Sequence, residues 1–515
     1  MIVANGLLAL PGTVKPVRAD MRIEGGRIAA IAVTDGKPVG LGLRPAPGEE
    51  FIDAEDLLVL PGAIDPHVHF DTPGFTSRET FLRGSAEAAR GGVTTVVDMP
   101  CTSLPPVVDA AALENKLAAV APMAVVDYGF YGGVRGFRGV RGAAGGVGSE
   151  TRGDGLERAM AEIADRVLAY KCYLLSGMET FPQVNHLELG RALAQAAKLG
   201  RPLMLHAEDA NYCEAARERV EVARGDEAAT WDDYVDSRPA EAERIACAVA
   251  AELALSMGCP GTLHVVHVGT SVAAEPLRRA GATFETCTHY LAFTREDFAV
   301  HGAALKTAPP VKTAYERERL WKLLADGAIS YVTSDHAPAS RKEKRTGSVW
   351  TDYGGIPGTG TLLPYLLSEG YLAGRLTLPR FLEAVSSAAA ARFGLDDRKG
   401  SLKVGKDADF VLVDIAKTTT ISGSRLYSKG RDTPFEGLTL KGSIRATYVR
   451  GGLVYDADRE ADPADTAAWA AGASAEAAAA VGAGPWASLG EELKAMAPGI
   501  VASPGSGRFL TRRPA

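Results

Sequence analysis

Residues 61–70 read PGAIDPHVHF, and this stretch predicts both the fold and the chemistry of the chain. An apolar run at 57–60 leads into it, and a Pro-Gly pair marks a turn before the histidines. His67 and His69 are spaced i and i+2, so on a strand their side chains point to the same face. Two neutral imidazoles that reach one point are typical of a metal site. The alternative is a polar pair at the end of a strand, without a ligand.

The composition is that of a globular enzyme with more than one domain. A chain of 515 residues is too long for one small domain but fits a large barrel with an accessory domain. The net charge of −7 gives no electrostatic support for nucleic-acid binding. No apolar run approaches 18 residues, and the N-terminus lacks the pattern of a signal peptide. We therefore expect a cytoplasmic protein that binds neither nucleic acid nor membrane.

The cysteines favour the same compartment. They are scattered and form no CxxC pair, which argues against a disulfide framework and against a cysteine zinc site. The six are Cys101, Cys172, Cys213, Cys247, Cys259 and Cys287.

The centre of the chain alternates strand-like apolar runs with helical stretches. Repeated units of this kind predict a parallel sheet, here a (β/α)8 TIM-type barrel over residues 57–395. Every run after the first ends in, or just before, a His or an Asp, and strand ends are where barrel active sites lie. The runs are 94–100, 203–206, 263–268 and 329–335, after helical stretches at 78–90, 187–199, 240–257 and 315–324.

The two ends of the chain have a different texture. Residues 1–56 and 396–458 contain short β-like runs and hairpin turns such as Gly25-Gly26, and neither piece is long enough to make a stable sheet alone. We expect one small β-sandwich domain built from both.

Two further segments break the pattern. Residues 459–515 are rich in Ala, Pro and Gly and predict a helix around 471–481 followed by a loose arm, for which a role in subunit contacts and disorder are the two alternatives. Residues 132–155, rich in Gly and Arg, favour a surface loop over an anion-binding loop.

Six polar residues occupy strand-end positions in the predicted barrel. His206 and His267 could be satisfied core histidines, and Asp335 could cap the following helix. Lys171 is unusual, because a lysine inside an apolar strand is costly to bury without a partner. Burial favours its neutral amine, which can react with CO2 to give a carbamate, an anion with two oxygens that can bridge two metal ions. The six are His67, His69, Lys171, His206, His267 and Asp335.

The order and spacing of these motifs resemble the amidohydrolase superfamily, and within it the cyclic-amidohydrolase branch of allantoinase, dihydroorotase and hydantoinase. The resemblance covers roughly residues 1–457 and is closest to allantoinase. The matching motifs are PGAIDPHVHF (61–70), GGVTTVVDMP (91–100), AYKCYLLSG (169–177), LMLHAED (203–209), HVVHVGTS (264–271), ETCTHY (285–290), TSDHAP (333–338) and GSLKVGKDADFVLVD (400–414).

The resemblance implies a hydrolase that opens a cyclic amide with two divalent metal ions, for which zinc suits the ligands. His67, His69 and Asp335 would hold one ion, and His206 and His267 the other. Carboxylated Lys171 and a hydroxide would bridge them. The bridging hydroxide would attack the ring carbonyl, and Asp335 would carry its proton to the leaving nitrogen.

The resemblance also implies the substrate contacts and the assembly. Backbone groups near Ala308 and Gly355 would contact the substrate. His289, at a predicted strand end, is a further candidate, whereas His264 faces the opposite way on its strand and is expected in the core or behind the ligands. The expected partners are a small cyclic amide and further copies of the chain, as a dimer or tetramer.

Non-catalytic structural relatives share this fold but lack metal ligands. Here all six ligand positions carry residues of the right type, which favours catalysis over a structural role.

The expected substrate follows from the residues that the chain lacks at the positions where dihydroorotases bind the substrate carboxylate. Dihydroorotases typically read HxHxR and MPNT, and the arginine and asparagine grip the substrate carboxylate. This chain has Asp71 and Cys101 at those positions, so a carboxylate there would meet repulsion in place of a partner. PCTSLPP (100–106) and KCYLLSGMETFP (171–182) look like allantoinase, which makes allantoin the expected substrate. Dihydroorotase and hydantoinase or dihydropyrimidinase remain the alternatives, because Arg78 or an arginine of the 132–155 loop could supply the missing charge.

Overall fold

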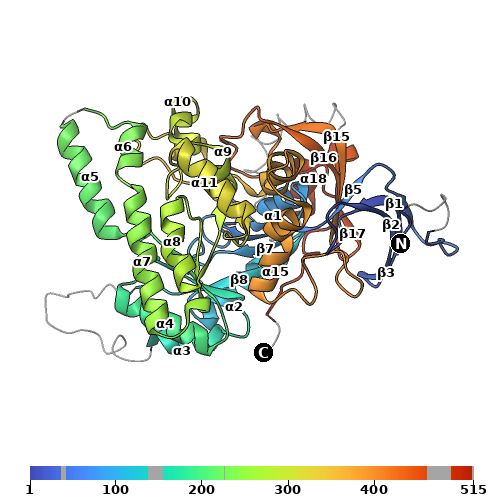
Figure 1. Cartoon of the computed structure of the whole chain (residues 1–515), viewed down its shortest axis with the longest axis horizontal. Coiled ribbons are helices and arrows are strands. Elements are labelled where there is room, and N and C mark those ends of the chain that lie inside the picture. The colour runs from blue at the N-terminus through green and yellow to red at the C-terminus, as the bar shows by residue number, and fades with distance from the viewer. Residues whose placement is uncertain (36–41, 137–154, 226, 461–488, 513–515) are drawn as a thin grey trace.

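Parallel strands form the centre of the molecule (Figure 1). The computed structural model describes residues 1–35, 42–136, 155–225, 227–460 and 489–512. Seven strands pair side by side in chain order, all parallel. They are β6 (Ala63–Val68), β7 (Val93–Asp98), β8 (Asp127–Gly133), β9 (Ala169–Tyr173), β10 (Leu203–His206), β11 (Leu263–Val265) and β12 (Thr283–Phe284).

Two short strands close this sheet on itself. β13 (Thr286–Cys287) continues β12 after Glu285, whose backbone still bonds to the neighbouring strand at Val265 and Val268. β14 (Val332–Thr333) pairs with β13, and the chain after it bridges in parallel to the end of β6, from His336 to Val68. The interrupted strand and β14 thus complete the curl, which confirms a TIM-type barrel.

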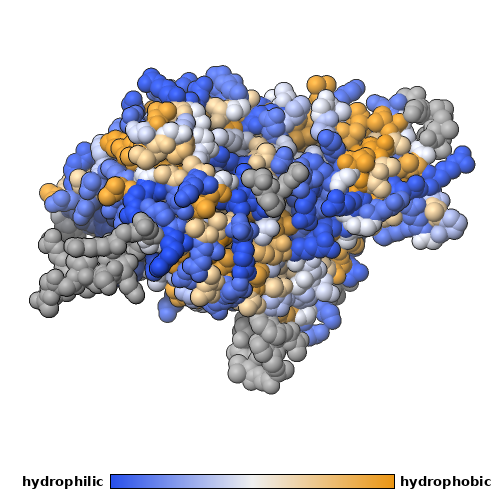
Figure 2. All heavy atoms as spheres, turned by 90° about the horizontal axis from the view of Figure 1, so that it is seen from below, coloured by the Kyte–Doolittle hydropathy of each residue, from blue (hydrophilic) through white to orange (hydrophobic). Residues whose placement is uncertain are grey.

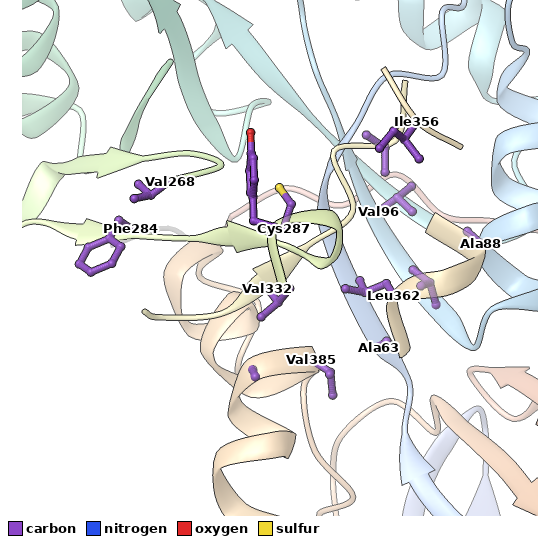
Figure 3. Close-up of a cluster of buried hydrophobic side chains, with 14 of the residues drawn as sticks. Ala63, Ala88, Val96, Val268, Phe284, Cys287, Val332, Ile356, Leu362 and Val385 are labelled. Atoms are coloured by element: carbon purple, nitrogen blue, oxygen red, sulfur yellow. The ribbon is translucent and has the colours of Figure 1, made fainter. Parts of the chain in front are cut away.

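Helices cover the barrel and bury its outer face. Side-chain caps fix the starts of several of them, such as Thr80 before the first and the Asn185–Glu188 capping box before the fourth. Figure 3 shows the packing, in which Val96 lies on the side of Leu362 and Ala88, and Val332 lies near Cys287 and Val385. The helices are α1 (Phe81–Arg90), α2 (Ala110–Val120), α3 (Gly155–Ile163), α4 (His186–Lys198), α7 (Ala240–Ser256), α8 (Ser271–Ala280), α11 (Ala314–Ala325), α13 (Leu362–Tyr365), α14 (Leu378–Leu382) and α15 (Ala388–Phe393). An insertion after β10 adds α5 (Ala210–Arg224) and α6 (Trp231–Asp236).

The two chain ends share an eight-stranded sheet beside the barrel. Gly25 and Gly26 turn one of its hairpins with φ of 57° and 79°, which glycine adopts without a steric penalty. The strands are β17 (Gly452–Asp456), β16 (Thr439–Val449), β15 (Phe410–Thr420), β5 (Leu58–Pro61), β1 (Ile2–Leu8), β2 (Val17–Glu24) and β3 (Arg27–Val33) in that order, with β4 (Phe51–Asp53) paired to β1. Because β5 bonds to β1 and β15, the chain passes from this sheet to the barrel at Pro61 and not at residue 56.

The C-terminal segment packs against the barrel and is not a loose arm in its described part. After α18 (Leu489–Met496), Arg508 and Leu510 exchange backbone hydrogen bonds with Tyr128 at 2.9 and 2.7 Å. The side chain of Leu510 is 1% exposed, and the Phe509 ring lies 5.2 Å from that of Phe130. These contacts form because the start of β8 offers free backbone groups beside apolar side chains. The helix predicted at 471–481 and most of the 132–155 loop lie outside the described residues.

The outer surface is mixed in character. Figure 2 shows hydrophilic residues over much of one face, with apolar residues between them. Among the described helices, none combines the length and the apolar character needed to cross a membrane. All six cysteines are free thiols.

Candidate active site

The predicted ligands converge at the carboxyl ends of the barrel strands. His67 lies at the end of β6, with His69 just beyond it, and His206 is the last residue of β10. His267 and Asp335 each follow a strand by two residues. Because strands of a closed parallel barrel end on one rim, residues more than 250 positions apart meet there.

The first group contains His67, His69 and Asp335. Their ligand atoms all lie within 4.8 Å of one another. Asp335 Oδ1 is 3.1 Å from Nε2 of His67 and 3.4 Å from Nε2 of His69. Burial would raise the pKa of Asp335, but the surrounding histidines hold it well below its usual value, so the carboxylate is ionised. This group offers two imidazoles and one carboxylate to a single cation.

His67 supports a cation at this point through its own hydrogen bonding. Its Nδ1 lies 2.7 Å from Oε1 of Glu285, and a carboxylate can only accept, so Nδ1 carries the proton. Burial holds the pKa of His67 well below its usual value, so Nε2 is unprotonated. The lone pair of Nε2 then faces the Asp335 carboxylate at 3.1 Å, an arrangement that a positive ion between them would stabilise.

The second group contains His206 and His267. Nδ1 of His206 lies 2.9 Å from Nε2 of His267, and the ring centroids are 4.6 Å apart. Burial lowers the pKa of both imidazoles, which favours the neutral form that binds metals. Two imidazoles are fewer ligands than a divalent ion needs, so this pair requires a further donor.

Lys171, on β9, lies beside the second group. Its side chain is fully buried, and Nζ has no hydrogen-bond partner among the described residues. Burial lowers the pKa of this amine, and a positive charge on Lys171 would lower the pKa of His206 and of His267 further. An unpaired buried lysine of this kind would be strongly destabilising as an ammonium ion, which fits conversion of the amine to an anionic group.

Two of the candidate ligand residues adopt a strained backbone. His267 has φ of 42° and Asp335 has φ of 48°, in the left-handed region that residues with a side chain avoid. Each such residue costs about 1–3 kcal/mol and persists where the surrounding structure enforces it, most often at functional sites. The strain turns both side chains toward the common point beyond their strands.

Two buried carboxylates hold the histidines in place, and sequence reasoning missed both. Glu285 bonds to His67 and also receives contacts from His264 at 3.2 Å. Glu208 lies 2.9 Å from Nε2 of His206, so the proton is on Nε2 and the Nδ1 lone pair is left for a ligand. Arg238 forms an ion pair with Glu208. Together with His206 it keeps the pKa of the Glu208 carboxyl below its usual range, although burial alone would raise it. Glu285 and Glu208 could have been found by the criterion that singled out Lys171, namely a charged residue within or next to an apolar strand.

A cavity of about 700 Å³ opens above these groups. Its floor contains the histidines of both groups and Asp335, and its walls come from α5, α6 and the loops at 175–178 and 350–355. Tyr173 stacks on His206 with ring centroids 5.2 Å apart, and its hydroxyl lies 3.1 Å from the thiol of Cys101. A volume of this size is in the range of small-molecule sites and admits a small ring with a substituent.

Of the other predicted residues, some line the cavity and others are buried behind it. Ala308 and Gly355 line the cavity. His289, in α9 (Thr288–Ala292), is not among the residues that line it. Its side chain is 1% exposed, and both of its ring nitrogens are buried without a hydrogen-bond partner among the described residues. His264 lies behind the ligands, as predicted, stacked on Tyr331.

Asp71 requires a correction. The sequence places it where dihydroorotases have an arginine, which predicts that it faces the substrate. In the structure it is 1% exposed and is absent from the cavity wall. Its φ of 55° turns the chain away after His69, and burial raises the pKa of the carboxyl well above its usual value. Asp71 therefore cannot repel a substrate carboxylate by direct contact, whereas Cys101 does line the cavity.

Comparison with known proteins gives a consistent result. The family model "Amidohydrolase family" matches residues 58–454. An allantoinase from Rubrobacter xylanophilus is 38% identical over 453 residues, which covers 86% of this chain and 94% of the relative. A dihydroorotase from Halobacterium salinarum is 37% identical over 446 residues, covering 85% and 94%. The solved structure of the L-hydantoinase (dihydropyrimidinase) from Arthrobacter aurescens superposes with a TM-score of 0.80 at 27% identity over 99% of both chains.

The family match and the superposition cover the barrel, the end sheet and every residue of the two histidine groups. Two curated allantoinases are 38% and 37% identical over 86% and 89% of this chain. This chain therefore belongs to the amidohydrolase family, in its cyclic-amidohydrolase branch.

Proposed function

We propose that the protein hydrolyses the ring C–N bond of a neutral cyclic ureide, with allantoin as the substrate. The observation that carries the proposal is the convergence of four histidines and Asp335 on the floor of one cavity, with the buried amine of Lys171 beside them. Amidohydrolases of the cyclic branch open cyclic amides, and this constellation offers the ligands and the proton acceptor that such a reaction needs.

We infer that the site takes two divalent ions. His67, His69 and Asp335 would hold one, and His206 and His267 the other. A carbamate on Lys171 would supply the anionic oxygens that the second group lacks, and it explains why the amine has no partner. When bound, a pair of zinc ions lowers the pKa of water and polarises a carbonyl.

The chain's own residues account for the remaining chemistry. Asp335 is ionised, partly exposed to the cavity and held between two imidazoles, so it can accept a proton from the attacking water. It can then return that proton to the ring nitrogen as the C–N bond breaks. Glu285 and Glu208 fix the tautomers of His67 and His206, which keeps their free lone pairs directed at the reaction site.

The cavity wall supports a neutral substrate. The position of Cys101 offers a thiol, not the amide of the dihydroorotase pattern, and the dihydroorotase arginine is replaced by buried Asp71. A substrate carboxylate would need a cation from elsewhere, and an unpaired buried carboxylate is costly. The second candidate is dihydroorotate, because a dihydroorotase matches this chain nearly as closely as the allantoinases do.

A substrate panel with metal analysis tests the proposal. Turnover of allantoin, hydantoin, dihydrouracil and dihydroorotate would be compared on one preparation whose metal content is measured. We expect more than one equivalent of divalent metal per chain and the highest kcat/KM with allantoin. A preparation that is fully active without metal would contradict the site, and a preference for dihydroorotate would contradict the substrate. A cytoplasmic location and assembly into a dimer or tetramer stay predictions.

A further inference from the structure

Arg78 reaches the cavity from the segment between β6 and α1. Its Nε donates to Oε1 of Glu343 at 2.7 Å, and its side chain is 23% exposed. Its terminal nitrogens make no hydrogen bond among the described residues. The guanidinium therefore presents its outer edge, with several N–H donors, to the cavity.

Contacts on two sides fix the orientation of this guanidinium. Its Cζ lies 4.4 Å from the ring centroid of Tyr353 and 5.2 Å from that of Phe75. Glu343 is itself fixed, because its other oxygen accepts from the backbone and hydroxyl of Ser340 in a capping box. A donor group that is already oriented loses little entropy when it binds.

Tyr353 adds a second donor to the same wall. It lines the cavity, and its hydroxyl has no hydrogen-bond partner among the described residues. Asp335 and the histidines of both groups line the same cavity. Arg78 and Tyr353 thus form an unsatisfied, rigid donor set close to where a substrate ring would react.

The electrostatic surroundings decide which kind of group this donor set prefers. Arg78 forms an ion pair with Glu343, and the pair carries no net charge. A carboxylate that approached Arg78 would meet the negative charge of Glu343 as well, whereas an uncharged carbonyl would gain the hydrogen bonds without that repulsion.

We propose that Arg78 and Tyr353 form a subsite for an uncharged, carbonyl-bearing arm on the substrate ring, and that Glu343 makes this subsite selective against a carboxylate. The inference rests on the proposed cyclic-amide activity and names the specificity-determining residues of that site. A ureido arm is one group of this class, since its carbonyl accepts two hydrogen bonds and bears no charge.

Three substrates that share one ring provide the test. Hydantoin carries no arm, allantoin carries a ureido arm, and hydantoin-5-acetic acid carries a carboxylate arm. The measured quantity is kcat/KM for each, with Arg78→Met, Arg78→Lys and Glu343→Gln compared with the unmodified protein. Glu343→Gln can keep the capping box with Ser340 through its single carbonyl oxygen. Its amide nitrogen cannot accept from Nε of Arg78, so the variant removes this hydrogen bond together with the negative charge.

We expect Arg78→Met to lower the allantoin-to-hydantoin ratio of kcat/KM by about 10- to 100-fold, the value of hydrogen bonds from a charged donor, mainly through KM. Arg78→Lys keeps the charge but not the planar fork, so part of the loss should remain. Glu343→Gln should raise kcat/KM for hydantoin-5-acetic acid relative to allantoin by about 5-fold or more, because one negative charge is removed.

Arg345→Met is the matched control. Arg345 holds the same loop through Asp432 but does not line the cavity, so both ratios should stay as in the unmodified protein. An equal loss on all three rings in the Arg78 variants would overturn the subsite. If Arg78→Met does not fold, the other two variants still test the subsite. It would be overturned if Arg78→Lys left the allantoin-to-hydantoin ratio of kcat/KM unchanged and Glu343→Gln left the ratio of hydantoin-5-acetic acid to allantoin unchanged. Failure of the unmodified, metal-loaded protein to open any of the rings would instead contradict the proposed function.

Discussion

Oε1 of Glu285 accepts a hydrogen bond from Nδ1 of His67 at 2.7 Å, across 218 positions of the chain. This bond sets the tautomer of the histidine and leaves Nε2 free on the side of Asp335. It links the barrel core to the candidate metal site, because Glu285 also contacts His264 and accepts from the hydroxyl of Thr333 at 3.1 Å.

Loss of this carboxylate should weaken metal binding. We expect Glu285→Ala to lower the affinity for the ion held by His67 by about 10- to 100-fold, the usual effect of removing a residue that orients a metal ligand. Competition with a chelator, followed by elemental analysis, measures this directly. Glu214→Ala is the control, since Glu214 lines the same cavity but is exposed and bonds to no ligand. Equal metal affinity in both variants would contradict the role of Glu285.

Lys171 should carry a carbamate in the metal-loaded protein. Lys171→Ala should lose the ion held by His206 and His267, with most of the activity, because two imidazoles alone bind a divalent ion weakly. Small carboxylic acids should restore part of the metal binding and part of the activity, since they can fill the space of the carbamate with an anionic group. Electron density at the lysine tip is the decisive observation, and a bare amine in a crystal with two ions would refute the prediction. Intact-mass measurement is unsuitable because the carbamate is lost in acid.

Asp335→Asn should damage turnover more than binding. The amide has the shape of the carboxylate but cannot take a proton from water, so kcat should fall by at least about 10²-fold, the scale of general acid–base catalysis. Metal content, measured on the same sample, separates loss of proton transfer from loss of the ion. Near-normal turnover with full metal occupancy would mean that another group carries the proton.

The C-terminal segment should stabilise the barrel without taking part in catalysis. Leu510 is 1% exposed and packs in the apolar core, so Leu510→Ala should destabilise the fold by about 2–5 kcal/mol through the lost contacts and the remaining cavity. Thermal unfolding should show a lower midpoint, and kcat at low temperature should be unchanged. Val300→Ala, at a site that is 82% exposed, is the control and should leave the midpoint in place.

Much of the fold follows from local patterns. The i, i+2 spacing of His67 and His69 on a strand requires both to face one side, and that geometry is independent of the rest of the chain. Alternation of apolar runs and helical stretches indicates a parallel barrel, which places every strand end on one rim. Five of the six candidate ligands could therefore be named from sequence, because each lies at or just after a strand end that the pattern predicts, and Lys171 stood out as a charged residue within an apolar strand.

The tertiary structure alone decided the surroundings of those residues. Glu285 and His67 are distant in the chain, and so are Arg78 and Glu343; no local pattern pairs them. Whether Asp71 faced the substrate depended on a single left-handed turn of the backbone after His69. The place of Leu510 depended on free backbone groups at the start of a strand far earlier in the chain. Local periodicity determines which face of a strand or helix a side chain occupies. The residue that it contacts on that face is set by packing between distant segments, and no short stretch of the sequence specifies that packing.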